Sequence, residues 1–244
     1  MNEKSYVDGS YWQQAAPNYF LTDSSWKAHH LFSLIDRTYL NKYTKRRLNV
    51  CEVGCGVGGV LSGFVELIRK QGISCSGTGY DISYEAIEKA RSLFPNISFE
   101  VTDIHNIQRK SDILLLVDVL EHVNNPLEFL SKCLDLSDLL VIHLPLDINY
   151  WGRLLIGKSY YKYLEEDRGH IHFFEKKTAL ELIHSVGADV IDWKYTKWGI
   201  EHDFDRSKSG RIARLLRTIG FHLNEDLSAR YFGGASIALF CSRN

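Results

Sequence analysis

The stretch of sequence that decides the fold reads Leu48-Asn49-Val50-Cys51-Glu52-Val53-Gly54-Cys55-Gly56-Val57-Gly58-Gly59. It predicts a short apolar strand, a glycine-rich turn and then a helix. The four glycines leave no Cβ where the backbone must bend sharply and approach a ligand, and the amides that open the next helix point at that ligand. A tight turn without a ligand would need only one or two glycines. The stretch therefore indicates a nucleotide-binding loop.

Composition sets the broad class. The chain has 244 residues, 45% of them apolar and 12% aromatic, which is enough to fill a sizeable core. Its 29 Lys and Arg against 30 Asp and Glu lack the basic excess of a general nucleic-acid binder. The start has no signal-peptide pattern, and no apolar run approaches the roughly 20 residues of a membrane span. We therefore expect a soluble, cytoplasmic protein that does not bind DNA.

Apolar and amphipathic segments alternate through the centre of the chain. Strands are predicted at 48–53, 74–80, 97–101, 113–117, 139–144, 188–195 and 235–241, and helices at 58–70, 83–93, 126–134 and 176–186. Such alternation predicts an α/β fold with a doubly wound, Rossmann-like parallel sheet. The runs 113–117 and 139–142 are continuously apolar, as strands buried on both faces require.

We expect one domain over residues 1–244. Residues 1–44 are predicted to form a helical lid, with a serine N-cap at Ser24-Ser25, and 45–145 to form the cofactor-binding core. The aromatic segment 146–174 and the irregular segment 197–230 are predicted to be substrate-side insertions. The five cysteines are odd in number and show no CxxC pair, so we expect buried thiols and neither disulfides nor a zinc site.

The glycine loop alone fits two cofactors. Gly54, Gly56 and Gly59 satisfy G-x-G-x-x-G, and Asp81 follows about 20 residues later, as in dinucleotide-binding folds. Glu52, however, lies in a buried strand where such folds carry an apolar residue, and a carboxylate there suits a cationic amine or sulfonium better than a pyrophosphate.

Further acidic groups follow the third and fourth strands. Asp103 is placed to accept from an exocyclic adenine amine, and Asp118, Glu121 and His122 emerge after the fourth strand. The carboxyl ends of parallel strands meet at one crevice, so we expect these groups beside Glu52.

These motifs together resemble the class I S-adenosylmethionine-dependent methyltransferases, most closely over residues 48–145. The first motif is Glu-Val-Gly-Cys-Gly-Val-Gly, the second Tyr80-Asp81-Ile82, the third Thr102-Asp103-Ile104, and the fourth Asp118-Val119-Leu120-Glu121-His122-Val123, a form common in small-molecule O-methyltransferases. The resemblance implies a seven-stranded sheet with an antiparallel last strand at 233–240.

The resemblance also implies cofactor contacts. Glu52, Gly54 and Gly56 would line the methionine part of S-adenosylmethionine, Asp81 the ribose, Ile82 the adenine face and Asp103 the adenine amine. The full implied cofactor-binding set is Glu52, Gly54, Cys55, Gly56, Asp81, Ile82, Asp103, Ile104 and Asp118. Asp118 would border the methyl group.

Transfer to oxygen usually needs a base, and His122, His143 and His170 are the candidates. Each could instead have only a structural role. His170 and His172 alternate in an extended segment, so their rings should share a side. Glu165, Glu166 and Asp167 are nearby, but solvated acidic loops are far commoner than metal sites, so no metal is expected.

We therefore expect an S-adenosylmethionine-dependent methyltransferase that acts on an oxygen, less readily a nitrogen, of a small molecule such as a sugar or natural-product intermediate. An RNA-modifying enzyme of the same fold, an NAD(P)-dependent oxidoreductase and a non-catalytic partner subunit are the alternatives. A homodimer remains open. A basic run with an apolar face predicts a surface helix docked on the fold, or one that meets an anionic partner; it comprises Arg206, Lys208, Arg211, Arg214 and Arg217 with Ile212, Leu215, Leu216 and Ile219.

Overall fold

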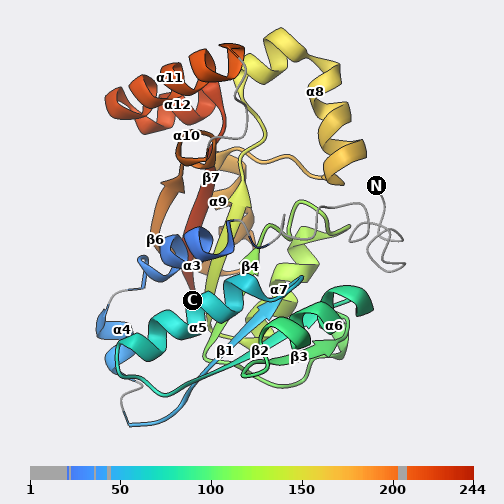
Figure 1. The fold of residues 1–244 in the computed structure, drawn as a ribbon, viewed down its shortest axis with the longest axis vertical. Helices are drawn as coiled ribbons and strands as arrows, with labels where there is room; N and C mark the ends of the chain where they lie inside the picture. The colour runs from blue at the N-terminus through green and yellow to red at the C-terminus, as the bar shows by residue number, and fades with distance from the viewer. Residues whose placement is uncertain (1–20, 22, 36, 43–44, 203–207) are drawn as a thin grey trace.

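The computed structural model describes residues 21, 23–35, 37–42, 45–202 and 208–244. Its centre is one seven-stranded sheet with the strand order β3-β2-β1-β4-β5-β7-β6 (Figure 1). The strands are β1 Leu48–Val53, β2 Cys75–Asp81, β3 Ser98–Val101, β4 Ile113–Val117, β5 Leu139–Pro145, β6 Ala188–Thr196 and β7 Ser236–Arg243. Strand β7 is antiparallel to both β5 and β6, while β1 to β5 pair in parallel. The predicted fold class and antiparallel last strand are confirmed.

Helices cover both faces of the sheet (Figure 1). The helices that pack on the sheet are α3 Ser24–Phe32, α5 Gly59–Lys70, α6 Tyr84–Leu93, α7 Pro126–Leu136 and α9 Lys176–Ser185. A short helix, α4 Arg37–Asn41, follows α3. A 3₁₀ turn, η2 Ile104–Asn106, follows β3.

Side chains on β4 explain why its sequence is continuously apolar. Leu114 and Leu116 belong to the core cluster that includes residues of α7 and α9, whereas Ile113 and Leu115 belong to the cluster that includes residues of α3, α5 and α6. Successive side chains of a strand point to opposite faces, and both faces are buried here, so no polar position is tolerated.

The remaining helices lie beyond one end of the sheet (Figure 1). They are η3 Gly152–Ile156, α8 Lys158–Tyr163, η4 Leu164–Arg168, α10 Trp198–Glu201, α11 Lys208–Leu223 and α12 Glu225–Phe232, of which η3 and η4 are π-helical. They come from the two segments predicted to lie on the substrate side. None of the helices within the described ranges is long and apolar enough to cross a membrane.

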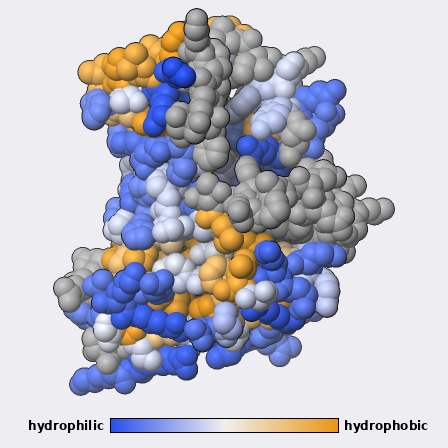
Figure 2. Space-filling view, viewed as in Figure 1, coloured by the Kyte–Doolittle hydropathy of each residue, from blue (hydrophilic) through white to orange (hydrophobic). Residues whose placement is uncertain are grey.

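One local prediction is wrong. Helix α3 begins after Asp23 rather than at a serine cap, and Asp23 pairs with Lys27 one turn later at 2.8 Å. Helix α11 is a surface helix that packs on α10 and α12, but its apolar face is open to solvent: Ile212 and Leu215 are 60% and 59% exposed. Instead, the Nε atoms of Arg214 and Arg217 donate to the carbonyls of Ile200 and Phe232. Figure 2 shows the resulting apolar surface over α11 and α12. Arg206 lies outside the described residues.

Candidate active site

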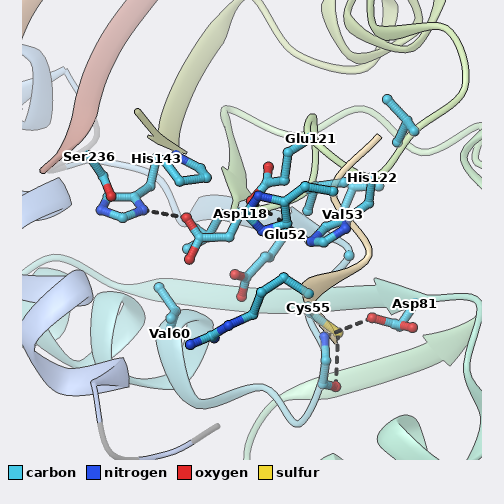
Figure 3. A pocket seen from close by; sticks show the side chains of 18 of the residues that line it. Glu52, Val53, Cys55, Val60, Asp81, Asp118, Glu121, His122, His143 and Ser236 are labelled. Atoms are coloured by element: carbon cyan, nitrogen blue, oxygen red, sulfur yellow. Dashed lines mark hydrogen bonds and ion pairs between the residues drawn. The ribbon is translucent and has the colours of Figure 1, made fainter. Parts of the chain in front are cut away.

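A cavity of about 700 Å³ lies at the carboxyl ends of β1, β2, β4 and β5. This volume is typical of a site for a small molecule or cofactor. All the predicted cofactor-binding residues line it: Glu52, Gly54, Cys55, Gly56, Asp81, Ile82, Asp103, Ile104 and Asp118. All three candidate bases, His122, His143 and His170, line it too. Figure 3 shows Glu52, Asp118, Glu121 and His122 around one space.

The glycine loop leaves β1 in a conformation that other residues rarely adopt. Gly54, Gly56 and Gly58 have φ angles of 72°, 51° and 79°. A Cβ on Gly54 would also lie 2.5 Å from a methyl carbon of Val119. The turn thus needs glycine for its backbone angles and for the close approach of the loop that follows β4.

Glu52 lies at the end of β1 with 2% of its surface exposed. Its Oε2 accepts a hydrogen bond from the Leu61 amide at 3.0 Å, so the carboxylate stabilises the first turn of α5. Burial raises the pKa of Glu52 to about 8, the Leu61 amide opposes the rise, and the Asp81 carboxylate adds to it. A nearby cation would favour the ionised form.

Asp81 ends β2 and connects the turn after β1 to the turn after β2. Its Oδ2 accepts from the Gly56 amide at 2.8 Å, and its Oδ1 accepts from the Ser83 amide at 2.9 Å. Burial raises the pKa of Asp81, against the effect of these two amides. Each carboxylate oxygen has a further lone pair with which to accept from a ligand.

Asp103 and Ile104 form the third side of the cavity. Asp103 is exposed, and its Oδ1 accepts from the His105 amide at 2.8 Å, which caps η2. Ile104 is 4% exposed and belongs to the core cluster that contains Tyr80. The pair therefore combines an acceptor at the rim with an apolar wall.

Asp118 follows β4 and is held by two partners. It lies 2.8 Å from Lys27 Nζ and 2.5 Å from His143 Nδ1. Although burial acts in the other direction, the Lys27 ammonium and the His143 imidazole hold the pKa of Asp118 well below its usual value. The same carboxylate, with Asp23, raises the pKa of Lys27 in spite of its burial.

His143 is engaged through both ring nitrogens. Since a carboxylate only accepts, a proton lies on Nδ1, and Nε2 lies 2.9 Å from the Thr196 hydroxyl oxygen. The ring is 2% exposed. This geometry suits a residue that orients Asp118 better than one that takes a proton from a substrate.

His122 and His170 lie together in the cavity. Their ring centroids are 5.0 Å apart. His122 Nδ1 lies 2.9 Å from the Gly169 carbonyl oxygen, and His170 Nδ1 lies 2.7 Å from Asp147 Oδ2. Both contacts place the proton on Nδ1, so Nε2 carries the lone pair in each neutral ring. His172 lies elsewhere, with Nε2 3.4 Å from the Asn124 carbonyl oxygen.

Burial gives two neighbouring groups unusual pKa values. It lowers the pKa of His122 to about 4, against the effect of the Gly169 carbonyl. It also raises the pKa of Glu121 well above the ordinary range, and the Asp118 carboxylate adds to this rise. His122 is therefore a neutral imidazole at neutral pH.

Sequence reasoning misses Lys27, Asp147 and Thr196, and it places Glu121 at this edge without a role. Asp147 had a usable signal, because it comes two residues after the end of β5 and strand ends supply this cavity. Lys27 and Thr196 had none, since nothing in their local sequence shows that they face Asp118 and His143.

Comparison with known proteins identifies the fold family. The family model described as "Methyltransferase domain" matches residues 25–192, which include β1 to β5, the first part of β6 and most of the residues that line the cavity. The chain belongs to this methyltransferase family. The predicted enzyme class and the resemblance to class I methyltransferases are thereby confirmed.

Individual relatives of this methyltransferase are distant. A norajmaline N-methyltransferase from Rauvolfia serpentina is 30% identical over 96 residues, which are 36% of this chain and 32% of that protein. The magnesium protoporphyrin IX methyltransferase ChlM of Synechocystis, crystallised with S-adenosylhomocysteine, has a TM-score of 0.61 and 14% identity, over 100% of this chain and 97% of its own. A putative sarcosine dimethylglycine methyltransferase from Galdieria sulphuraria has a TM-score of 0.59 and 13% identity, over 89% and 84%. At these identities the two structures show a shared fold.

Proposed function

We propose that the chain transfers a methyl group from S-adenosylmethionine to an oxygen atom of a small molecule. The observation that supports this most is the cavity itself, in which a glycine loop and the carboxylates of Glu52 and Asp81 meet on a methyltransferase fold. The Glu52 carboxylate would attract the cationic groups of this cofactor, and it would repel the pyrophosphate of a dinucleotide.

The residues at different strand ends contact different parts of the cofactor. Glu52, Gly54 and Gly56 flank its methionine end, and Asp81 accepts from the ribose hydroxyls. Ile82 packs on the adenine, and Asp103 accepts from the adenine amine. Asp118 then borders the methyl group, with its orientation fixed by Lys27 and His143.

Methyl transfer is an in-line displacement. The acceptor oxygen forms a bond to the methyl carbon while the carbon–sulfur bond breaks, and the sulfonium becomes a neutral thioether. Positioning provides most of the rate enhancement. The acceptor proton must leave, and His122 and His170 are the better placed candidates, because each carries a lone pair on Nε2.

The acceptor side of the cavity is aromatic. Tyr160, Tyr163 and Trp198 line it, all from the helices beyond the sheet end. Flat rings suit an acceptor with an apolar face, and the near balance of 29 basic and 30 acidic residues argues against RNA. The N-methyltransferase relative keeps a nitrogen acceptor as the second candidate.

Calorimetric titration tests the cofactor assignment. We expect S-adenosylmethionine and S-adenosylhomocysteine to bind and NADH not to bind. Asp81→Asn should weaken binding by roughly 10- to 100-fold, because hydrogen bonds from hydroxyls to an ionised group are lost. Asp135→Asn, at an exposed pair with Arg243, is the matched control. Binding of NADH in place of the methyl donor would overturn the proposal.

Turnover with an acceptor library tests the reaction. Formation of S-adenosylhomocysteine with a panel of hydroxyl and amine acceptors should identify the acceptor class. His122→Asn and His170→Asn should lower kcat far more than cofactor affinity, while His184→Asn, on the exposed face of α9, should not. Wild-type kcat in both active-site variants would rule out a base at these positions. A chain inactive alone but active with a second protein would be a partner subunit.

A further inference from the structure

Three side chains on the acceptor side of the cavity form a cluster that the transfer step above does not fully use. Glu121, His122 and His170 each offer one ligand atom, and these atoms all lie within 4.8 Å of one another. Glu121 and His122 follow β4, and His170 follows η4. The topology thus brings two imidazoles and a carboxylate together from segments about 50 residues apart.

Glu121 is a buried carboxyl group that lacks a hydrogen-bond partner among the described residues. Its side chain is 1% exposed, and neither carboxylate oxygen accepts a hydrogen bond from any residue within the described ranges. His122 Nε2 lies 3.8 Å from Oε1. A buried carboxyl group without partners costs several kcal/mol, and protonation alone would leave its hydroxyl without an acceptor.

The surroundings of the two histidines match those of metal ligands. His170 Nδ1 donates to the Asp147 carboxylate, and His122 Nδ1 donates to the Gly169 carbonyl. Metal-bound histidines almost always donate their other ring N–H to a carboxylate or carbonyl, which fixes the ring and raises the basicity of the ligating nitrogen. His122 presents Nε2 to Glu121, and His170 contributes a ligand atom within 4.8 Å of both.

We propose that Glu121, His122 and His170 bind one divalent transition-metal ion. Two imidazoles and one carboxylate are the ligand set of ions from Mn²⁺ to Zn²⁺ rather than of Ca²⁺ or Mg²⁺, which prefer oxygen. Three protein ligands leave positions open for an acceptor oxygen. This departs from the sequence-based expectation of no metal, which considered Glu165, Glu166 and Asp167 instead.

The role of the ion rests on the proposed function. With this ion bound, His122 and His170 act as ligands and no longer as bases. A cation that binds the acceptor oxygen lowers the pKa of its hydroxyl group, so the proton leaves to solvent before the oxygen attacks the methyl carbon. The carbon–oxygen bond forms as the carbon–sulfur bond breaks, and no change of oxidation state occurs. The buried pocket of Glu121 would then serve to hold a fixed positive charge beside the acceptor.

A titration with Co²⁺ tests the site directly. The full chain, without an affinity tag and after chelator treatment, should bind one Co²⁺ with a visible absorption band typical of nitrogen and oxygen ligands. His170→Ala and Glu121→Gln should each weaken Co²⁺ binding at least 100-fold, and Asp147→Asn should weaken it by roughly 10- to 100-fold. His172→Ala, two residues from His170, should bind as the wild type does.

Titration of S-adenosylmethionine in the same variants shows whether they are folded. Retained cofactor binding with lost Co²⁺ binding supports the metal site. Absence of Co²⁺ binding by the wild type, or equal binding by the wild type and both ligand variants, would overturn it. Co²⁺ binding without cofactor binding would contradict the proposed function and leave the metal site standing, so the two failures are distinguishable.

Discussion

At the scale of single residues, Asp118 has the most informative conformation. Among the described residues it is the one non-glycine with a positive φ, 54°. Such backbone angles persist only where surrounding contacts hold them, and they gather at functional sites. Lys27 and His143 supply those contacts, so helix α3 and strand β5 together aim the Asp118 side chain into the cavity.

The ion pair of Asp118 should make stability depend on acid pH. Because the pKa of Asp118 is lowered in the folded state, its contribution is present above the ordinary value of 3.8 and is lost as pH falls toward the folded value. Asp118→Asn should lower the free energy of unfolding by about 2 kcal/mol at pH 7. This loss should shrink below pH 4 in urea titrations.

A surface carboxylate provides the comparison. Asp135 pairs with Arg243 at 3.1 Å, and both side chains are exposed. Asp135→Asn should cost less than about 1 kcal/mol at either pH. A pH-independent loss in the Asp118 variant would show that shape, rather than charge, makes Asp118 important.

The protonation of Glu52 should respond to the charge of the bound cofactor. With a pKa of about 8 it is mostly protonated at pH 7, and a cationic ligand favours its ionised form. Binding of S-adenosylmethionine should therefore release close to one proton at pH 7, and affinity should rise as pH approaches 8. Calorimetry in phosphate and in Tris measures the proton count. Equal proton release by Glu52→Gln would contradict this assignment.

At the scale of elements, the cost of placing a side chain in the turn between β1 and α5 has a backbone part and a packing part. Gly54 and Gly72 have similar φ angles of 72° and 79°, but a Cβ on Gly72 would meet nothing within 4 Å. Gly72→Ala should cost only the backbone term of about 1 to 2 kcal/mol. Gly54→Ala should cost about 1 to 3 kcal/mol more, because its Cβ meets Val119.

Urea unfolding of the two variants measures this difference. The double variant Gly54→Ala, Val119→Ala should recover part of the excess, since it removes the methyl groups in conflict. Equal costs for the two single variants would mean that the loop after β4 adapts to the new Cβ and does not constrain the turn.

The sequence predicts elements well where burial alone decides them. Strands β4 and β5 are apolar on both faces, and parallel strands end at one edge, so Asp81, Asp103 and Asp118 could be placed at the cavity. The orientation of side chains and helix faces is harder to predict from the sequence. One partner of the His143 ring is Thr196, which lies 53 residues away in the chain. The face of α11 that packs inward is the one whose arginines donate to backbone carbonyls. The pairing of His122 with His170 crosses an irregular segment that has no periodicity to read.

At the scale of the whole molecule, β7 joins β6 to the parallel strands β1 to β5. It pairs with β5 over seven residue positions and with β6 along its other edge. The side chains of Ile237, Leu239 and Phe240 are completely buried. The strand thus contributes both ladder hydrogen bonds and core volume.

Truncation of one leucine in β7 and of one on α11 should change the free energy of unfolding by different amounts. Leu239→Ala removes a side chain that is 0% exposed and should cost about 2 to 5 kcal/mol. Leu223→Ala removes one that is 82% exposed and should change the free energy of unfolding by less than about 0.5 kcal/mol. A large loss at Leu223 would reveal that this surface is covered in solution, for instance by a second copy of the chain.

The position of β7 also affects synthesis. Strand β5 ends at Pro145, yet the strand that covers its edge begins only at Ser236. At ribosomal speeds of about 5 to 20 residues per second, the unpaired edge of β5 waits roughly 5 to 20 s for its neighbour. During that interval a nascent chain presents an apolar strand with open hydrogen-bonding groups. The yield of native protein in a cell should therefore depend on translation rate and chaperone supply more than the stability of the finished fold would suggest.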